Sequence, residues 1–185
     1  MHASPDLQRR SCLKRSAGLA ALMASGTLTA CAAGEDRGLQ FSTLQQVADE
    51  LQRLSAAPLD SNAVWSWSQT LEHCAQSIEF SMTGFPEPKS AVFQNTAGAA
   101  AFRFFQWRGR MIHNLAEPIP GAPPLAADAP AAASLARLQN AMAAFAAWTA
   151  PLQPHFAYGT LGKPDYEQAH AMHLAQHLSG FKLKA

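Results

Sequence analysis

Three of the seven histidines lie close together near the C-terminus, at His170, His173 and His177. On an α-helix, where successive residues are rotated by about 100°, these three side chains share one face. His173 and His177 are separated by about one helical turn, so both imidazoles can reach a single metal ion. The spacing therefore predicts part of a metal site on a helix.

A third ligand must come from another segment, because two imidazoles leave a metal ion with too few protein ligands. His73 is the best candidate in the sequence. On its predicted helix it lies away from the apolar stripe and shares a side with Gln69, Ser77 and Phe80. A helix with one apolar side and one mixed side can pack on the core and also face a pocket.

Three neutral imidazoles are a known ligand set for Zn²⁺, and they leave the fourth coordination position open. The same ligands suit Ni²⁺ and Cu²⁺, so the sequence predicts a divalent metal, with zinc or nickel preferred, and does not identify it. In an open site such an ion lowers the pKa of its water and polarises a substrate oxygen. The alternative is that the histidines are ordinary packed residues, bonded to backbone carbonyls.

The hydrophobic pattern predicts the helices that must position these side chains. Five segments have apolar residues at helical spacing, namely residues 42–55, 64–82, 95–108, 131–148 and 164–179. The last one has Pro164 in its first turn and Gly180 after its end, which suit a helix start and stop. Residues 110–130 contain five prolines and predict an extended surface loop. Strand patterns are weak, so we predict an all-α fold of four principal helices and a short accessory helix.

Two segments resemble known protein families. Residues 65–75 (WSWSQTLEHCA) resemble the first-histidine helix of the DinB-like (DinB/YfiT-type) superfamily. Residues 155–178 resemble an uncharacterised branch of that superfamily, the domain-of-unknown-function family 1569. The resemblance covers most of residues 41–181.

The resemblance implies an up-down four-helix bundle with one histidine on an early helix and a His-x-x-x-His pair on the last. These map to His73, His173 and His177 as metal ligands. His170 would then orient a ligand through a hydrogen bond, or replace His173 as a ligand. His155, in the loop before the last helix, would line the mouth of the pocket, where it could orient a ligand or replace one, or would be a surface histidine.

The first 30 residues have the layout of an export signal, with a basic stretch followed by a short, weakly apolar run. Arg9 and Arg10 belong to a segment that resembles the twin-arginine export motif. Residues 28–31 (LTAC) resemble a bacterial lipobox, in which the cysteine is acylated and becomes the new N-terminus. We therefore predict a protein exported to the periplasm or cell envelope and anchored to the membrane at Cys31. The alternative is a soluble secreted protein.

The chain is predicted to have three parts, a signal peptide at residues 1–30, a flexible tether at 31–40 and a helical domain at 41–185. Four of the 14 Lys and Arg and one of the 13 Asp and Glu lie in the signal, which leaves a formal charge of −2. This balance, without a basic stripe, argues against a nucleic-acid partner. With Cys12 removed and Cys31 acylated, Cys74 has no disulfide partner and is predicted to be a packed thiol.

The sequence leaves three functions open. The first is a metal-dependent hydrolase or transferase acting on a small-molecule substrate. The second is a non-catalytic envelope protein that binds a metal or small ligand, and the third is a structural bundle whose histidines only pack. Characterised members of the DinB-like superfamily include metal-dependent transferases of low-molecular-weight thiols. Those thiols are mainly cytosolic, so the predicted export argues against that activity.

Overall fold

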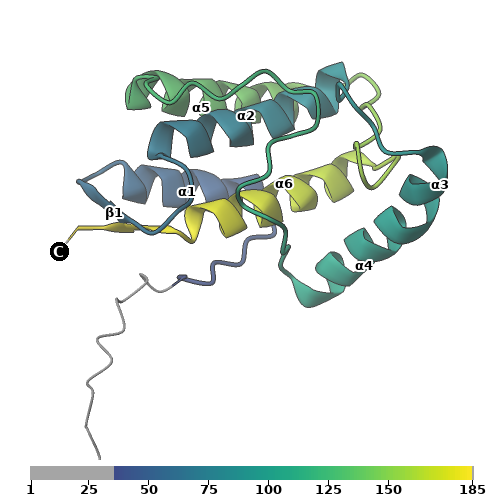
Figure 1. Cartoon of the computed structure of the whole chain (residues 1–185), viewed down its shortest axis with the longest axis horizontal. Coiled ribbons are helices and arrows are strands. Elements are labelled where there is room, and N and C mark those ends of the chain that lie inside the picture. Colours follow the sequence, from purple (N-terminus) through teal and green to yellow (C-terminus); the bar gives the residue numbers. More distant parts are fainter. Residues whose placement is uncertain (1–35, 185) are drawn as a thin grey trace, which may run out of the picture. The chain divides into compact units, whose positions relative to one another are not determined.

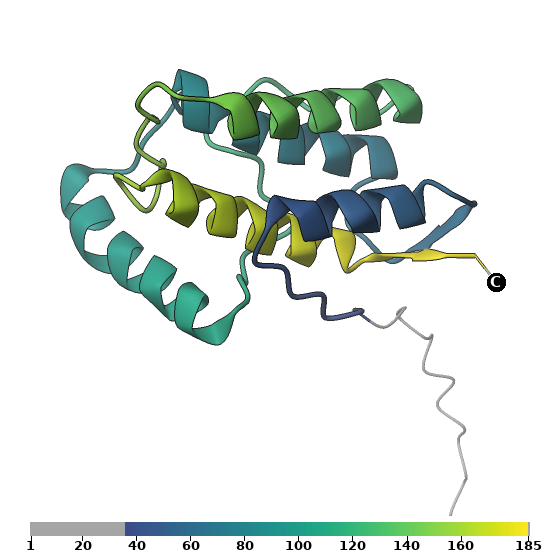
Figure 2. The same ribbon diagram turned by 180° about the vertical axis from the view of Figure 1, so that it is seen from behind.

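The computed structural model describes residues 36–184 and is mostly helical. Four long helices lie side by side, α1 (Leu44–Leu54), α2 (Trp67–Thr83), α5 (Ala131–Ala147) and α6 (Lys163–Leu178) (Figure 1). The view from behind shows the same arrangement (Figure 2). A further helical segment consists of α3 (Ala91–Phe93), the π-helical turn η1 (Gln94–Gly98) and α4 (Ala99–Arg108). The predicted helices are thus all present, and only the third begins several residues earlier than its pattern indicated.

The helices that carry the candidate ligands have well-defined starts. The α2 helix begins after a capping box, in which the Ser66 side chain accepts from the Gln69 backbone N–H and the Gln69 side chain bonds back. The α6 helix has Pro164 and Asp165 in its first turn, where a proline loses no helical hydrogen bond and an acid favours the helix dipole. α2 packs against both α5 and α6, and α6 also packs against α1.

The core lies between these helices. Leu51 of α1, Leu71 and Ile78 of α2 and Leu174 of α6 are all almost fully buried and belong to one hydrophobic cluster. Cys74 is completely buried in the same cluster, and burial raises the pKa of its thiol. The prediction that Cys74 is a packed thiol is therefore confirmed.

Two short strands contradict the expectation that the fold contains helices alone. β1 (Leu59–Ser61) pairs antiparallel with β2 (Phe181–Leu183), with Leu59 opposite Leu183. Each strand has three residues, too few to show an alternating pattern. The partners are also distant in sequence, and they meet because α6 brings the C-terminus beside the connection between α1 and α2.

The proline-rich segment forms the predicted loop. Residues 109–130 contain no helix or strand, and they connect α4 to α5 by crossing α6 and α2 (Figures 1 and 2). The side-chain amide of Gln76 on α2 donates to the Pro123 carbonyl over 3.0 Å. A second contact between this loop and a helix, at His113, is part of the candidate site.

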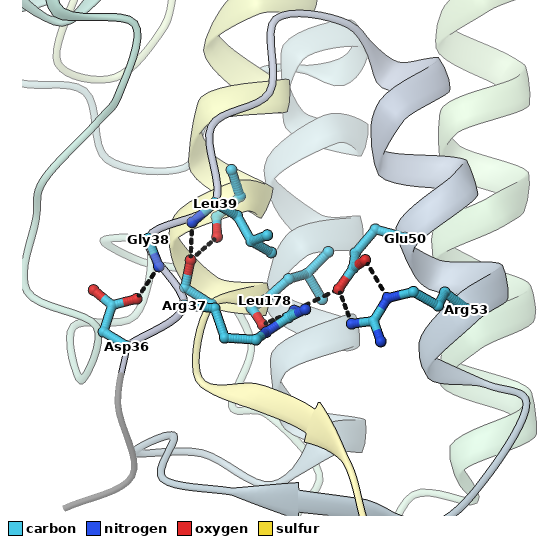
Figure 3. A network of polar contacts seen from close by, with 9 residues as sticks. Asp36, Arg37, Gly38, Leu39, Glu50, Arg53 and Leu178 are labelled. Atoms are coloured by element: carbon cyan, nitrogen blue, oxygen red, sulfur yellow. Dashed lines mark hydrogen bonds and ion pairs between the residues drawn. The ribbon is translucent and has the colours of Figure 1, made fainter.

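The first described residues are held against the end of α6 (Figure 3). Arg37 donates to the Leu178 carbonyl over 3.0 Å and to the buried carboxylate of Glu50, which also accepts from Arg53. The Leu39 backbone N–H donates to the Ser179 hydroxyl over 2.9 Å. Burial raises the pKa of Glu50, but the hydrogen bonds from Arg53 and Arg37 outweigh it and lower that pKa.

Several sequence predictions fall outside the described residues. These are the signal peptide, the export motif at Arg9 and Arg10, the acylated Cys31 and the first half of the tether. No helix between residues 36 and 184 has both the length and the apolar character needed to cross a bilayer.

Candidate metal centre

Four imidazoles converge between α2, α6 and the proline-rich loop. One ring nitrogen from each of His73, His113, His173 and His177 lies within 4.8 Å of the other three. The Nε2 atoms of His73 and His173 are 3.2 Å apart, as are those of His113 and His177. Nitrogen ligands around tetrahedral zinc, at about 2.0–2.1 Å from the ion, are separated by about 3.3 Å. The two closest pairs already have this spacing.

Two helices and a loop supply these four rings. His173 and His177 are one turn apart on α6, and His73 comes from α2, which packs against it. His113 comes from the loop, where Gln176 of α6 holds its backbone. The Gln176 side chain accepts from the His113 N–H over 3.1 Å and donates to the His113 carbonyl over 2.9 Å. The helix that provides two of the rings thus also positions the loop that provides a third.

Burial favours the neutral form of all four rings. Burial, and to a smaller extent the nearby His113, lowers the pKa of His73 to about 4. Burial followed by the charges of the neighbouring imidazoles keeps the pKa values of His173 and His177 well below the usual value. Burial also lowers the pKa of His113, although Gln176 and Glu117 oppose this effect. A neutral imidazole has the free lone pair that a metal ion requires.

Packing fixes the orientation of two of the rings. The Trp65 ring stacks on His177 with 5.7 Å between ring centroids, and it meets His73 edge-on at 4.8 Å. In the described part of the chain, the buried Nδ1 atoms of His73 and His113 have no hydrogen-bond partner. The Trp65 contact therefore helps to orient His73, and the backbone contacts to Gln176 position His113. Many metal sites instead use a hydrogen bond to the second ring nitrogen.

The structure brings together the three histidines singled out from the sequence and adds His113. That residue lies in a loop, so no helical spacing relates it to the pair on α6. Its only distinguishing feature in the sequence is its residue type. The two hydrogen bonds from the Gln176 side chain, which bring His113 to the site, are tertiary contacts that leave no local pattern in the sequence.

His170 lies outside the four-ring cluster. It is 2% exposed and packs against Phe145 and Tyr166, with ring centroids 5.2 and 5.4 Å away. Among residues 36–184, no hydrogen bond joins it to any of the four rings, so the expected orienting contact is not seen. Its Nε2 atom is buried without a partner in this part of the chain.

His155 is also outside the cluster, and the interpretation of it as a surface residue is wrong. It is 8% exposed because residues 155–159 fold back on themselves through a bridge between His155 and Gly159. Its Nδ1 atom accepts the backbone N–H groups of Ala157 and Tyr158 over 3.1 and 3.2 Å. No local sequence pattern predicts this turn, which buries the ring against Tyr158.

A cavity of about 250 Å³ lies beside the cluster. Three of the four rings, those of His73, His113 and His173, form part of its wall, and His155 and His170 form another part. A small molecule in this cavity would therefore reach an ion held by the four rings. The volume is somewhat below that of pockets for drug-sized ligands, about 300–1,000 Å³.

The comparison with protein families gives a match but no activity. The family model described as "Protein of unknown function (DUF1569)" matches residues 33–184, a range that contains all the described helices and the four clustered histidines. Neither a curated protein nor a solved structure matches the chain. Because the family model covers most of the chain, the protein belongs to the DUF1569 family of proteins of unknown function.

Proposed function

We propose that the protein binds a divalent transition-metal ion through His73, His113, His173 and His177. The convergence of these neutral rings from three separate segments carries the proposal. Two pairs of Nε2 atoms lie 3.2 Å apart, which also allows a hydrogen bond between the two rings of each pair when one of them carries the proton. A shared cation satisfies all four lone pairs at once.

The ligand type narrows the choice of metal. The cluster contains imidazoles alone, without a carboxylate or thiolate among its four members, and this favours zinc, nickel or copper over magnesium or calcium. When bound, the ion would act as a Lewis acid towards a molecule in the adjacent cavity. Four histidines can complete the coordination of zinc, whereas nickel and copper readily accept a further ligand.

The arrangement supports a DinB-like, up-down four-helix bundle as the underlying fold. α1, α2, α5 and α6 correspond to its four helices. The resemblance implies a histidine on an early helix and a His-x-x-x-His pair on the last. His73 of α2 and the His173 and His177 pair of α6 fit that description. His113 is then an addition to the three-histidine arrangement.

The proposed location is the cell envelope. Arg9 and Arg10 would direct export by the twin-arginine route, and acylation of Cys31 would anchor the mature protein in the membrane. The start of the family match at residue 33, just after the proposed cleavage site, supports this division of the chain. A soluble secreted protein, cleaved nearby, is the alternative.

The cavity favours a role that involves a small molecule. A metal-dependent hydrolase or transferase would use the open side of the cluster, where three of the rings meet the cavity. The presence of a fourth histidine favours the second candidate, a non-catalytic protein that binds a metal or small ligand, because four protein ligands can close a zinc site.

Elemental analysis of the full-length protein, purified from its natural compartment, tests the proposal. We expect about one transition-metal ion per chain, loss of that ion in His73→Ala, and weaker binding in His113→Ala, which keeps the other three histidines. His170→Phe is the matched control, because it replaces a buried histidine outside the cluster by a ring of similar shape. Protein without stoichiometric metal, whose thermal stability is unchanged by His73→Ala, would rule out the site.

A further inference from the structure

The cavity beside the cluster has features of a ligand site that the metal proposal does not use. Its wall combines the imidazoles with apolar side chains, including Met111, Ile119 and Tyr158. Met111 and Ile119 are 6% and 5% exposed, so the apolar part of the wall is well shielded from solvent. Such a cavity fits a small molecule with an apolar body and few polar groups.

The charge of the site points to an anion. The cluster offers only imidazoles, which bind a metal ion as neutral ligands, so it leaves the double positive charge of a bound ion uncompensated in a partly buried place. Lys89 also lines the cavity, and its ammonium group forms no ion pair or hydrogen bond within residues 36–184. Its backbone N–H donates to the Phe156 carbonyl over 2.8 Å, which holds the backbone of Lys89 beside the cavity, and its side chain is exposed. One carboxylate, Glu117, lines the cavity as well and is exposed.

His170 adds a polar residue to the wall of the same cavity. Its ring is 2% exposed, its Nε2 atom has no partner in the described chain, and the residue is part of the cavity wall. Phe145 and Tyr166, which pack against its ring, place it in an otherwise aromatic environment. A buried ring nitrogen without a partner is costly, so a ligand in the cavity that reached Nε2 would supply the hydrogen bond that this atom lacks.

We propose that the cavity binds a small organic monocarboxylate with an apolar body, a proposal that rests on the metal site described above. One carboxylate oxygen faces the ion held by the cluster. The other accepts a hydrogen bond from Nε2–H of His170, and the apolar body lies against Met111 and Ile119. Lys89 adds a favourable charge at the wall, while Glu117 disfavours a second negative charge on the ligand.

Cobalt-loaded full-length protein tests this proposal, because the visible absorption of Co²⁺ reports changes in its surroundings. The probe is benzoate, and benzamide is the matched neutral compound of the same shape. We expect saturable spectral changes with benzoate, and binding of benzamide at least about tenfold weaker. His170→Phe keeps the aromatic packing and removes the nitrogen, so it should retain cobalt and bind benzoate about tenfold more weakly.

Each outcome decides between the two proposals. Wild-type protein that takes up no cobalt overturns the metal site and the carboxylate site together. Cobalt uptake without a response to benzoate, or equal binding of benzoate and benzamide, overturns only the carboxylate site. Unchanged benzoate affinity in His170→Phe also overturns it. If His170→Phe does not fold, the comparison of benzoate with benzamide on wild-type protein still decides.

Discussion

Replacing Gln176 by leucine removes the two hydrogen bonds that hold the backbone of His113 beside α6. These bonds span 3.1 and 2.9 Å, and both join uncharged groups. A neutral hydrogen bond contributes about 0.5–1.5 kcal/mol to the folded state, so the pair is worth about 1–3 kcal/mol. Without these two hydrogen bonds, the loop must be ordered when the ion binds, and the free-energy cost of that ordering reduces the metal affinity.

The expected loss of metal affinity follows from that range. A cost of about 1–3 kcal/mol corresponds to a fall of about 5- to 150-fold in the affinity for Zn²⁺. The number of ions bound per chain should stay the same, because Gln176 is not itself a ligand. Competition with a chromophoric chelator measures both quantities on the same sample.

A double-mutant cycle separates positioning from a general loss of stability. In the His113→Ala background the two hydrogen bonds from Gln176 no longer position a metal ligand, so Gln176→Leu should not reduce zinc affinity further. Equal losses of affinity in both backgrounds would refute the positioning role of Gln176. An unchanged affinity of Gln176→Leu in the wild-type background would refute the role of His113 as a ligand held by α6.

Three further predictions concern stability and location. Burial, aided by a nearby histidine, lowers the pKa of His155 to about 3. The metal-free protein should therefore be most stable above about pH 6.5, where unfolded histidine is neutral, and lose stability as the pH falls towards 3. Urea unfolding at several pH values measures this loss, and a pH dependence unaltered in His155→Asn would contradict it. Cys74→Ser should cost about 1–3 kcal/mol of unfolding free energy with metal content unchanged, because it leaves a hydroxyl in the core. A thiol reagent that labels native Cys74 rapidly would contradict its burial. Replacing Arg9 and Arg10 by lysine should retain the protein in the cytoplasm, and Cys31→Ser should release it from membranes. Fractionation of cells checks both, and normal export of the lysine variant would exclude the twin-arginine route.

The helices and three of the clustered histidines could be predicted because they depend on local patterns. His173 and His177 belong to one helix, whose start at Pro164 and stop near Gly180 are encoded by neighbouring residues. His73 was identifiable because it departs from the apolar stripe of its own helix. In each case the informative residues lie within a few turns of one another.

The remaining features depend on contacts between distant segments. His113 reaches the cluster through Gln176, and β1 pairs with a strand at the opposite end of the chain. His155 is buried by a tight turn that no local sequence pattern predicts. None of these contacts leaves a periodic signal, so the fourth ring and the burial of His155 emerged only from the structure.

X-ray absorption spectroscopy of zinc-loaded, full-length protein tests the metal centre most directly. The four-histidine site predicts nitrogen neighbours at about 2.0–2.1 Å, with the multiple-scattering pattern of about four imidazoles. His113→Ala should reduce that pattern to about three imidazoles. A sulfur neighbour at about 2.3 Å, or a shell of oxygen atoms without imidazole scattering, would contradict the account.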